Sequence, residues 1–131
     1  MDISPTALKY AKAHAKQADV SLDLGVHSFV RLPFREGVFD FVFDMGCFHH
    51  VEPPDRNQFI SGVHRVLRSG ALYMLTCFSY KNGSGWNHFT KKQLIDLFSE
   101  LFLFAQVRHY ASVEGDGVTR FFYTVLMQKK K

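Results

Sequence analysis

The sequence lacks a paired-cysteine pattern, a long apolar run and a signal peptide. Its two cysteines, Cys47 and Cys77, lie far apart and form no C-x-x-C pair, which argues against a disulfide framework or a zinc ribbon. No stretch reaches the roughly 18 apolar residues that a membrane-spanning helix needs, and residues 1–5 lack the charged start of a leader. We therefore expect a soluble protein of the reducing cytoplasm, without membrane association.

The chain also lacks a concentrated block of charge. It carries 16 Lys and Arg against 12 Asp and Glu, a formal net charge of +4, and these residues are spread along the sequence except for Lys129–Lys131. No basic stripe follows one helix and no nucleic-acid reader motif occurs. The basic end is expected to be a solvated tail, and a nucleic-acid partner is not favoured.

What is present in quantity is apolar and aromatic. Hydrophobic residues make up 47% of the 131 residues, and 14 of them are Phe. Disordered segments are poor in aromatics because they cannot offset chain entropy by burial. This composition predicts one folded domain over residues 1–131 with a sizeable core.

Helix starts are marked by capping residues. Ser4 followed by Pro5 predicts a helix over residues 5–17. A second helix is expected after Pro53 and Pro54, ending near residues 69–70. Thr90 with Gln93 forms a capping box that predicts a third helix over residues 91–103.

Strand-like runs alternate with these helices. Residues 26–30 and 38–45 are short apolar stretches that periodicity alone would pair as a hairpin. Residues 71–78 form a continuous apolar run, typical of a buried parallel strand. Residues 104–111 and 120–127 suit a terminal antiparallel pair. The pattern predicts an α/β fold with a doubly wound sheet.

Four motifs occur in a fixed order along the chain. They are Asp-Ile-Ser-Pro at 2–5 with Ala-Lys at 11–12, Leu-Pro-Phe-Arg-Glu-Gly-Val-Phe-Asp at 32–40, Phe-His-His-Val at 48–51 and Arg-Val-Leu-Arg-Ser-Gly at 65–70. In this order they resemble the class I S-adenosylmethionine-dependent methyltransferases. The resemblance implies the Rossmann-like sheet of that family, here expected to be N-terminally truncated because its glycine-rich cofactor loop has no counterpart in the chain.

The resemblance implies S-adenosylmethionine as the cofactor and assigns residues to it. Asp2 matches the acidic residue that accepts hydrogen bonds from the ribose hydroxyls, although an acid leading a helix is an equally good account of it. Ile3 would lie on the adenine face, with Phe29 as a possible adenine wall. Ser28 stands where many relatives carry an Asp that accepts from the adenine amino group.

The segment after the 38–45 strand would line the cofactor and the transferring methyl group. Asp44, Gly46, Cys47 and His50 are the positions the resemblance implies there, and Gly46 would allow close approach of a ligand to the backbone. Ligand sites of open α/β sheets lie at the carboxyl ends of strands, where this segment is expected.

Candidate catalytic bases lie in the same segment. Methyl transfer mainly needs alignment of nucleophile and methyl, so a general base is optional; His49, His50 and Glu52 are the candidates. The alternative is that one histidine packs inside while the other faces solvent. A metal site is not expected, because adjacent histidines diverge and no second ligand cluster completes a coordination sphere.

Two further residues lie in the loop after the 71–78 strand. Trp86 and His88 are candidate contacts for the methyl acceptor, since loops at this end of the sheet commonly hold substrate. The alternative is that a partly buried Trp86 anchors the loop.

The resemblance predicts a methyltransferase domain or fragment acting on an unidentified, small-molecule acceptor. The alternative function is a non-catalytic module of the same descent, used for interaction or oligomerisation. In the family two central strands lie between the counterparts of residues 26–30 and 38–45, and their absence would leave unpaired backbone. We expect self-association or an N-terminal complementing segment to fill that place.

Overall fold

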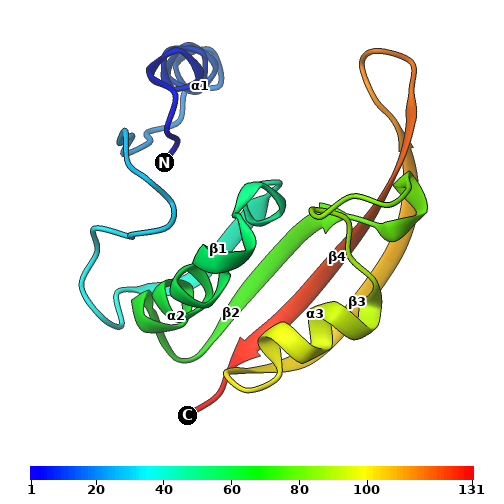
Figure 1. Ribbon diagram of the computed structural model, residues 1–131. Helices are drawn as coiled ribbons and strands as arrows, with labels where there is room; N and C mark the ends of the chain where they lie inside the picture. The colour runs from blue at the N-terminus through cyan, green and yellow to red at the C-terminus, as the bar shows by residue number, and fades with distance from the viewer.

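The computed structural model describes residues 1–131, which form two parts (Figure 1). The smaller part is residues 1–28, which contain helix α1 (Pro5–Gln17). Ser4 caps α1 by accepting from the amide of Ala7, and Pro5 opens the helix, as the sequence predicts. The larger part is a sheet with two helices on it.

The sheet has four strands in the order β1-β2-β4-β3. They are β1 (Phe39–Met45), β2 (Leu67–Phe78), β3 (Phe102–Val113) and β4 (Thr119–Lys129). β1 pairs parallel with β2, and β4 lies antiparallel between β2 and β3. The predicted α/β class with a terminal antiparallel pair is confirmed, and β1 occupies one edge of the sheet.

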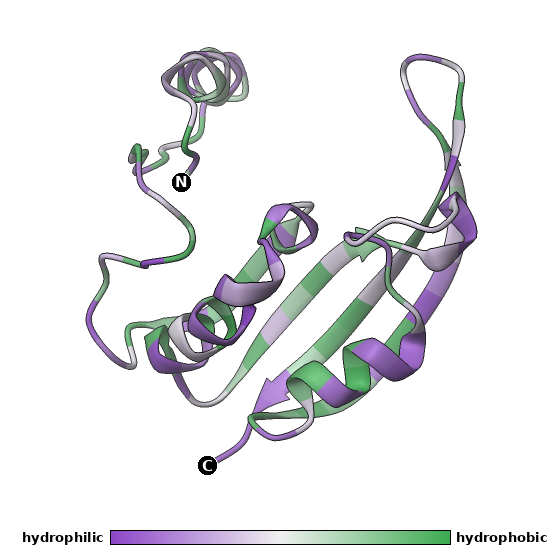
Figure 2. Ribbon diagram, viewed as in Figure 1, coloured by the Kyte–Doolittle hydropathy of each residue, from purple (hydrophilic) through white to green (hydrophobic).

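Helices α2 (Arg56–Val66) and α3 (Lys91–Phe98) lie on the same face of this sheet (Figure 1). Three single 3-10 turns complete the fold: η1 (Phe48–His50), η2 (Pro53–Asp55) and η3 (Tyr80–Asn82). Figure 2 shows α3 with an apolar and a polar side and hydrophobic colour recurring along the strands. None of the helices combines the length and hydropathy needed to cross a membrane.

The core lies between the helices and one face of the sheet. Alternate residues of β2, from Ala71 to Cys77, are buried in it together with Tyr123, Val125 and Met127 of β4. This alternation follows from the period of two in a strand. The helices cover only that face.

The strand predicted over residues 26–30 does not form, and the prediction was wrong. A single parallel bridge between Asp2 and Val26 is all that remains of it. A strand requires a neighbour along its length, and here only one residue supplies pairing. The hairpin that periodicity favours is absent for the same reason, since β1 pairs with β2 instead.

Two boundaries also differ from the prediction. Helix α3 ends at Phe98 rather than at residue 103, because Phe102 already pairs with Lys129 in the sheet. Strand β2 begins at Leu67, so Ser69 and Gly70 lie inside it rather than ending a helix. Gly70 has φ +74 where the β1–β2 register shifts, a conformation that L side chains rarely adopt.

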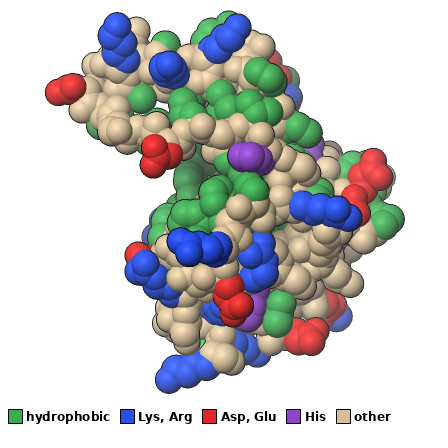
Figure 3. Space-filling model, turned by 90° about the vertical axis from the view of Figure 1, so that its left-hand side faces the viewer, with side chains coloured by type: hydrophobic (Ala, Val, Ile, Leu, Met, Phe, Trp, Pro, Cys, Tyr) green, Lys and Arg blue, Asp and Glu red, His purple; other side chains and the backbone are tan.

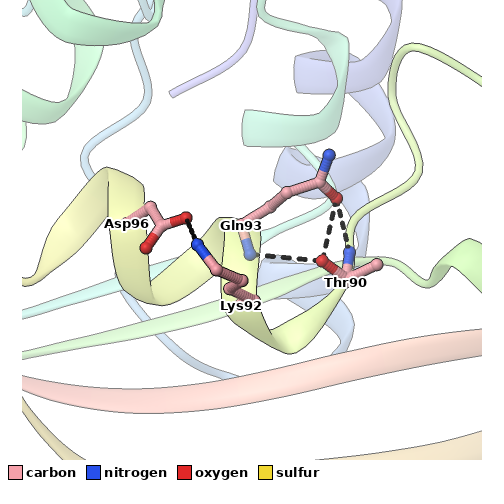
Figure 4. A network of polar contacts seen from close by, with 4 residues as sticks. All are labelled: Thr90, Lys92, Gln93 and Asp96. Carbon is pink, nitrogen blue, oxygen red and sulfur yellow. Dashed lines mark hydrogen bonds and ion pairs between the residues drawn. The ribbon is translucent and has the colours of Figure 1, made fainter.

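The capping box of α3 gives a test of local stability (Figure 4). The Thr90 hydroxyl accepts from the Gln93 amide at 3.2 Å, and the Gln93 side chain accepts from the Thr90 amide at 2.8 Å. Thr90→Ala should lower the free energy of unfolding by about 1 kcal/mol in urea titration followed by Trp86 fluorescence. Lys92→Ala, which breaks only the exposed Lys92–Asp96 ion pair, should cost less than about 0.5 kcal/mol. Equal losses would contradict the cap's role.

Candidate functional site

An open cavity of about 870 Å³ lies beside the free edge of β1. Figure 3 shows hydrophobic side chains gathered in the hollow between the two parts of the molecule. One wall comes from β1, the turn after it and α2, and the other from residues 1–28. Lining residues of the first wall include Phe41, Phe43, Asp44 and Cys47, and those of the second include Met1, Gly25 and His27. No backbone hydrogen bond joins residues 1–28 to the sheet.

The turn that follows β1 is held by a buried carboxylate. Asp44 is 5% exposed and accepts hydrogen bonds from the amide of Cys47 at 2.7 Å, the amide of Phe48 at 3.2 Å and the Tyr73 hydroxyl at 3.0 Å. Burial raises the pKa of Asp44, against the lowering effect of these donors. Its oxygens are thus engaged within the protein, and Asp44 shapes the turn that carries Gly46 to His50.

His49 is an internal support of that turn. Its ring stacks on Phe78 with centroids 3.9 Å apart, and its Nδ1 accepts from the Phe78 amide at 3.2 Å. Burial, followed by the charge of His50, lowers the pKa of His49 to about 4. At neutral pH the ring is therefore uncharged, with its proton on Nε2 and Nδ1 already occupied.

His50 and Gly46 present the accessible side of the turn. The His50 ring is exposed and lies 4.4 Å from that of His49. Gly46 has φ +86, and a Cβ added there would lie 3.3 Å from Cε1 of His49. Both the backbone conformation and the neighbouring ring therefore favour glycine at this position.

Asp2 lies in the smaller part and does not line the cavity itself, but its charge acts on Cys47 of this turn. Its Oδ1 accepts from the Ser4 amide at 2.7 Å, so part of its role is to lead helix α1. Burial, and after it the charges of Asp44 and Asp2, raise the pKa of the Cys47 thiol to about 11. The thiol is therefore protonated at neutral pH, and it lies within the electrostatic reach of Asp2.

The remaining candidates fall into different places. Phe29 lines the cavity and packs edge-on against Phe59 at 6.2 Å. Ser28 is exposed and accepts from the Val30 amide at 3.3 Å, while Ile3 is 61% exposed; neither lines the cavity. Glu52 is exposed and precedes η2. No three His, Cys, Asp or Glu side chains are grouped so that they could hold a metal ion.

A second, smaller cavity of about 270 Å³ holds both candidate acceptor residues, Trp86 and His88. Arg56 also lines it, donating to the Trp86 carbonyl at 2.7 Å and lying 4.8 Å from the Phe89 ring centre. Sequence analysis missed Arg56. The available signal was its position in the first turn of a helix, where the helix dipole disfavours a positive charge. A cation at such a position indicates that it serves another interaction.

Comparison with known proteins matches residues 1–75 to the methyltransferase domain family. The chain belongs to this family. It is 40% identical over 75 residues to an uncharacterized methyltransferase of Synechocystis, covering 57% of this chain and 34% of that protein. It is 32% identical over 84 residues to norajmaline N-methyltransferase of Rauvolfia serpentina, covering 61% and 27%. The chain thus spans about a third of these relatives or less.

Solved structures show the same fold over nearly the whole chain. The N-methyltransferase NodS of Bradyrhizobium japonicum, crystallised with S-adenosylhomocysteine, matches 99% of this chain and 65% of its own with a TM-score of 0.80. Sequence identity in that match is 14%, so it reports the fold alone. The predicted class I methyltransferase architecture is confirmed.

The buried state of His49 predicts a specific pH dependence. In the unfolded chain His49 has the ordinary histidine pKa of 6.5, whereas in the folded protein its pKa is about 4. The unfolded state therefore takes up a proton first, and the free energy of unfolding falls as the pH is lowered from 6.5 toward 4. The loss attributable to His49 should reach roughly 3 kcal/mol. His49→Gln should flatten this part of the curve, and His50→Gln should retain it, in urea titrations at a series of pH values. Parallel curves for wild type and His49→Gln would refute the assignment.

Proposed function

We propose that this chain supplies one side of an S-adenosylmethionine site in a methyltransferase that acts on a small molecule. The observation that carries the proposal is the turn from Gly46 to His50, which leaves the carboxyl end of β1 beside the large cavity and contributes Cys47 to its lining. Open α/β sheets bind ligands at this end of their strands. Membership of the methyltransferase domain family gives the reaction class.

The residues present fit such a ligand. A volume of about 870 Å³ lies within the range of small-molecule sites. Asp2 uses one carboxylate oxygen for the Ser4 amide, and its second oxygen can accept from a diol. Gly46 offers backbone without a side chain, and Phe29 offers an aromatic surface. Of these three, Phe29 lines the cavity, while Asp2 and Gly46 are the chain neighbours of the lining residues Met1 and Cys47.

S-adenosylmethionine, when bound, supplies a methyl group already activated by a sulfonium centre. The chain's own residues then bind and orient. Asp2 accepts from the ribose hydroxyls, Phe29 contacts the adenine and Gly46 admits the ligand to the backbone. His50, whose ring is exposed, is the better candidate of the two histidines to take a proton from the acceptor, while His49 supports the turn. Glu52, also exposed, stays a weaker candidate base.

The acceptor is proposed to be small and to contact the loop after β2. One relative methylates a nitrogen of norajmaline according to its name, which supports this substrate class. Trp86 and His88 line a cavity with Arg56, and together they offer an aromatic face and polar groups for an acceptor. A cytoplasmic location, expected from two unpaired cysteines, remains a prediction.

Calorimetric titration with S-adenosylhomocysteine and S-adenosylmethionine tests the proposal. We expect binding by the wild-type chain, and Asp2→Asn should weaken it about tenfold or more because hydrogen bonds to a charged acceptor are lost. Gly46→Ala should also weaken binding, since its Cβ would meet the His49 ring. Asp19→Asn, at an exposed position just beyond the C-cap of α1, is the matched control and should bind as wild type does.

The two possible failures have different meanings. Absence of binding by the wild-type chain would overturn the proposal for this chain and favour the non-catalytic module. Binding that Asp2→Asn leaves unchanged would keep the cofactor but remove Asp2 from its site.

A further inference from the structure

The tip of the loop after β2 is tied to the rest of the protein by one arginine. We call residues 83–88 the acceptor loop. Within it, Nδ1 of His88 lies 2.8 Å from the carbonyl oxygen of Gly83. The one hydrogen bond that links the loop to a distant part of the sequence comes from Arg56 of α2, which donates to the Trp86 carbonyl at 2.7 Å. The position of the loop tip therefore depends on Arg56.

Arg56 also reaches the end of the turn after β1. We call residues 46–50 the cofactor turn. The Nε of Arg56 donates to the carbonyl of Val51 at 3.4 Å, and Val51 directly follows this turn. Val51 is held by the turn itself, because its amide donates to the Phe48 carbonyl at 2.9 Å and its side chain is 1% exposed. A planar guanidinium carries several donors and can serve two carbonyls at once, so Arg56 joins the two segments.

The same guanidinium lies near two aromatic rings. Its central carbon is 4.8 Å from the ring centre of Phe89 and 5.9 Å from that of Trp86. A cation at such distances from a ring is attracted to it. Phe89 is buried, and its amide donates to the Phe78 carbonyl at the end of β2 at 3.0 Å. Arg56 therefore contacts both the backbone and the ring of Trp86 from a fixed base.

The loop held in this way carries His88 toward the histidines of the cofactor turn. The His88 ring lies edge-on to Phe78 at 5.7 Å, and His49 stacks on the same Phe78 ring at 3.9 Å. A carbonyl oxygen only accepts hydrogen bonds, so the contact with Gly83 places the proton of the neutral His88 ring on Nδ1. Nε2 of His88 then keeps a lone pair, which can accept from an N–H or O–H group.

We propose that Arg56 is a positioning residue that couples the acceptor loop to the cofactor turn. The inference rests on the proposed function, which gives the turn to S-adenosylmethionine and the loop to the methyl acceptor. A ligand that shifts the turn also shifts Val51, and Arg56 transmits the shift to Trp86 through its two carbonyl contacts. The acceptor that fits is a small amine or hydroxyl compound, because Nε2 of His88 accepts from a donor. Such coupling aligns the two reactants of a transfer.

Fluorescence of Trp86, the one tryptophan of the chain, tests the coupling. Titration of the wild type with S-adenosylhomocysteine should change the Trp86 emission with the same dissociation constant that calorimetry gives. Arg56→Gln should bind S-adenosylhomocysteine within about threefold of the wild-type affinity but lose most of the emission change. Arg108→Gln, which removes an exposed arginine of β3, is the matched control and should respond as the wild type does.

A second measurement needs no ligand. Arg56→Gln should raise the acrylamide quenching constant of Trp86 by about 1.5-fold, a limited rise because that side chain is already 55% exposed. Arg56→Lys should show a similar rise, because its ammonium keeps the charge but lacks the planar fork that reaches two carbonyls. Circular dichroism checks that each variant is folded. Unchanged quenching in both folded variants overturns the positioning role.

The outcomes separate this inference from the proposed function. Absence of S-adenosylhomocysteine binding by the wild type removes the proposed function and the coupling with it. Binding without a change in Trp86 emission, or with an equal change in Arg56→Gln, overturns the coupling and leaves the cofactor site in place. Loss of binding in a folded Arg56→Gln would assign Arg56 to the cofactor site itself, which also contradicts the coupling.

Discussion

Phe48 is the side chain on which both the core and the candidate site depend. It is fully buried, and its ring lies 5.6 Å from Phe59 of α2, 5.2 Å from Phe89 and 5.0 Å from Phe98 of α3. Aromatic contacts at these distances contribute beyond the area they bury. Because Phe48 also belongs to the turn of Gly46 and His50, the packing that joins the two helices fixes where that turn leaves the sheet.

The buried carboxylate of Asp44 also holds the turn that contains Phe48. Asp44 accepts from the amides of Cys47 and Phe48 and from the hydroxyl of fully buried Tyr73. The turn is therefore fixed from below by a hydrogen-bonded carboxylate and from the side by an aromatic cluster. Such supported turns hold nearby groups in place before a ligand arrives, which is the arrangement that alignment-driven reactions use.

Local chemistry in the sequence predicted the elements that local interactions stabilise. The Ser4 cap and the Thr90 capping box located two helix starts, and the apolar run at 71–78 located the centre of β2. Residues 26–30 failed because strand formation depends on a neighbour that no local pattern reports. The end of α3 was missed because pairing of Phe102 in the sheet outweighs its helical spacing.

The site shows the same division. The ordered motifs pointed to Asp2 and to the turn of Gly46 to His50, and the structure brings Met1, the neighbour of Asp2, and Cys47 of that turn to one cavity. The separate roles of His49 and His50 could not be predicted from the sequence. The supporting role of His49 depends on a hydrogen bond from the amide of Phe78, which lies far along the chain at the end of β2. The engagement of Asp44 by Tyr73 likewise joins residues far apart in the sequence.

The segment that links the two parts of the molecule is held by a clamp, a set of hydrogen bonds between Arg65 and backbone groups, which depends little on the side chains of that segment. Arg65 of α2 donates to the carbonyls of Leu32 and Phe34, and the Gly37 amide donates to the Arg65 carbonyl at 3.0 Å. Every partner of Arg65 in this clamp is a backbone group. Substitutions in the connecting segment therefore leave these hydrogen bonds intact as long as the backbone keeps its path. Replacement of Arg65 itself would remove the bonds that hold this segment against α2, and the distance between the two cavity walls would no longer be fixed.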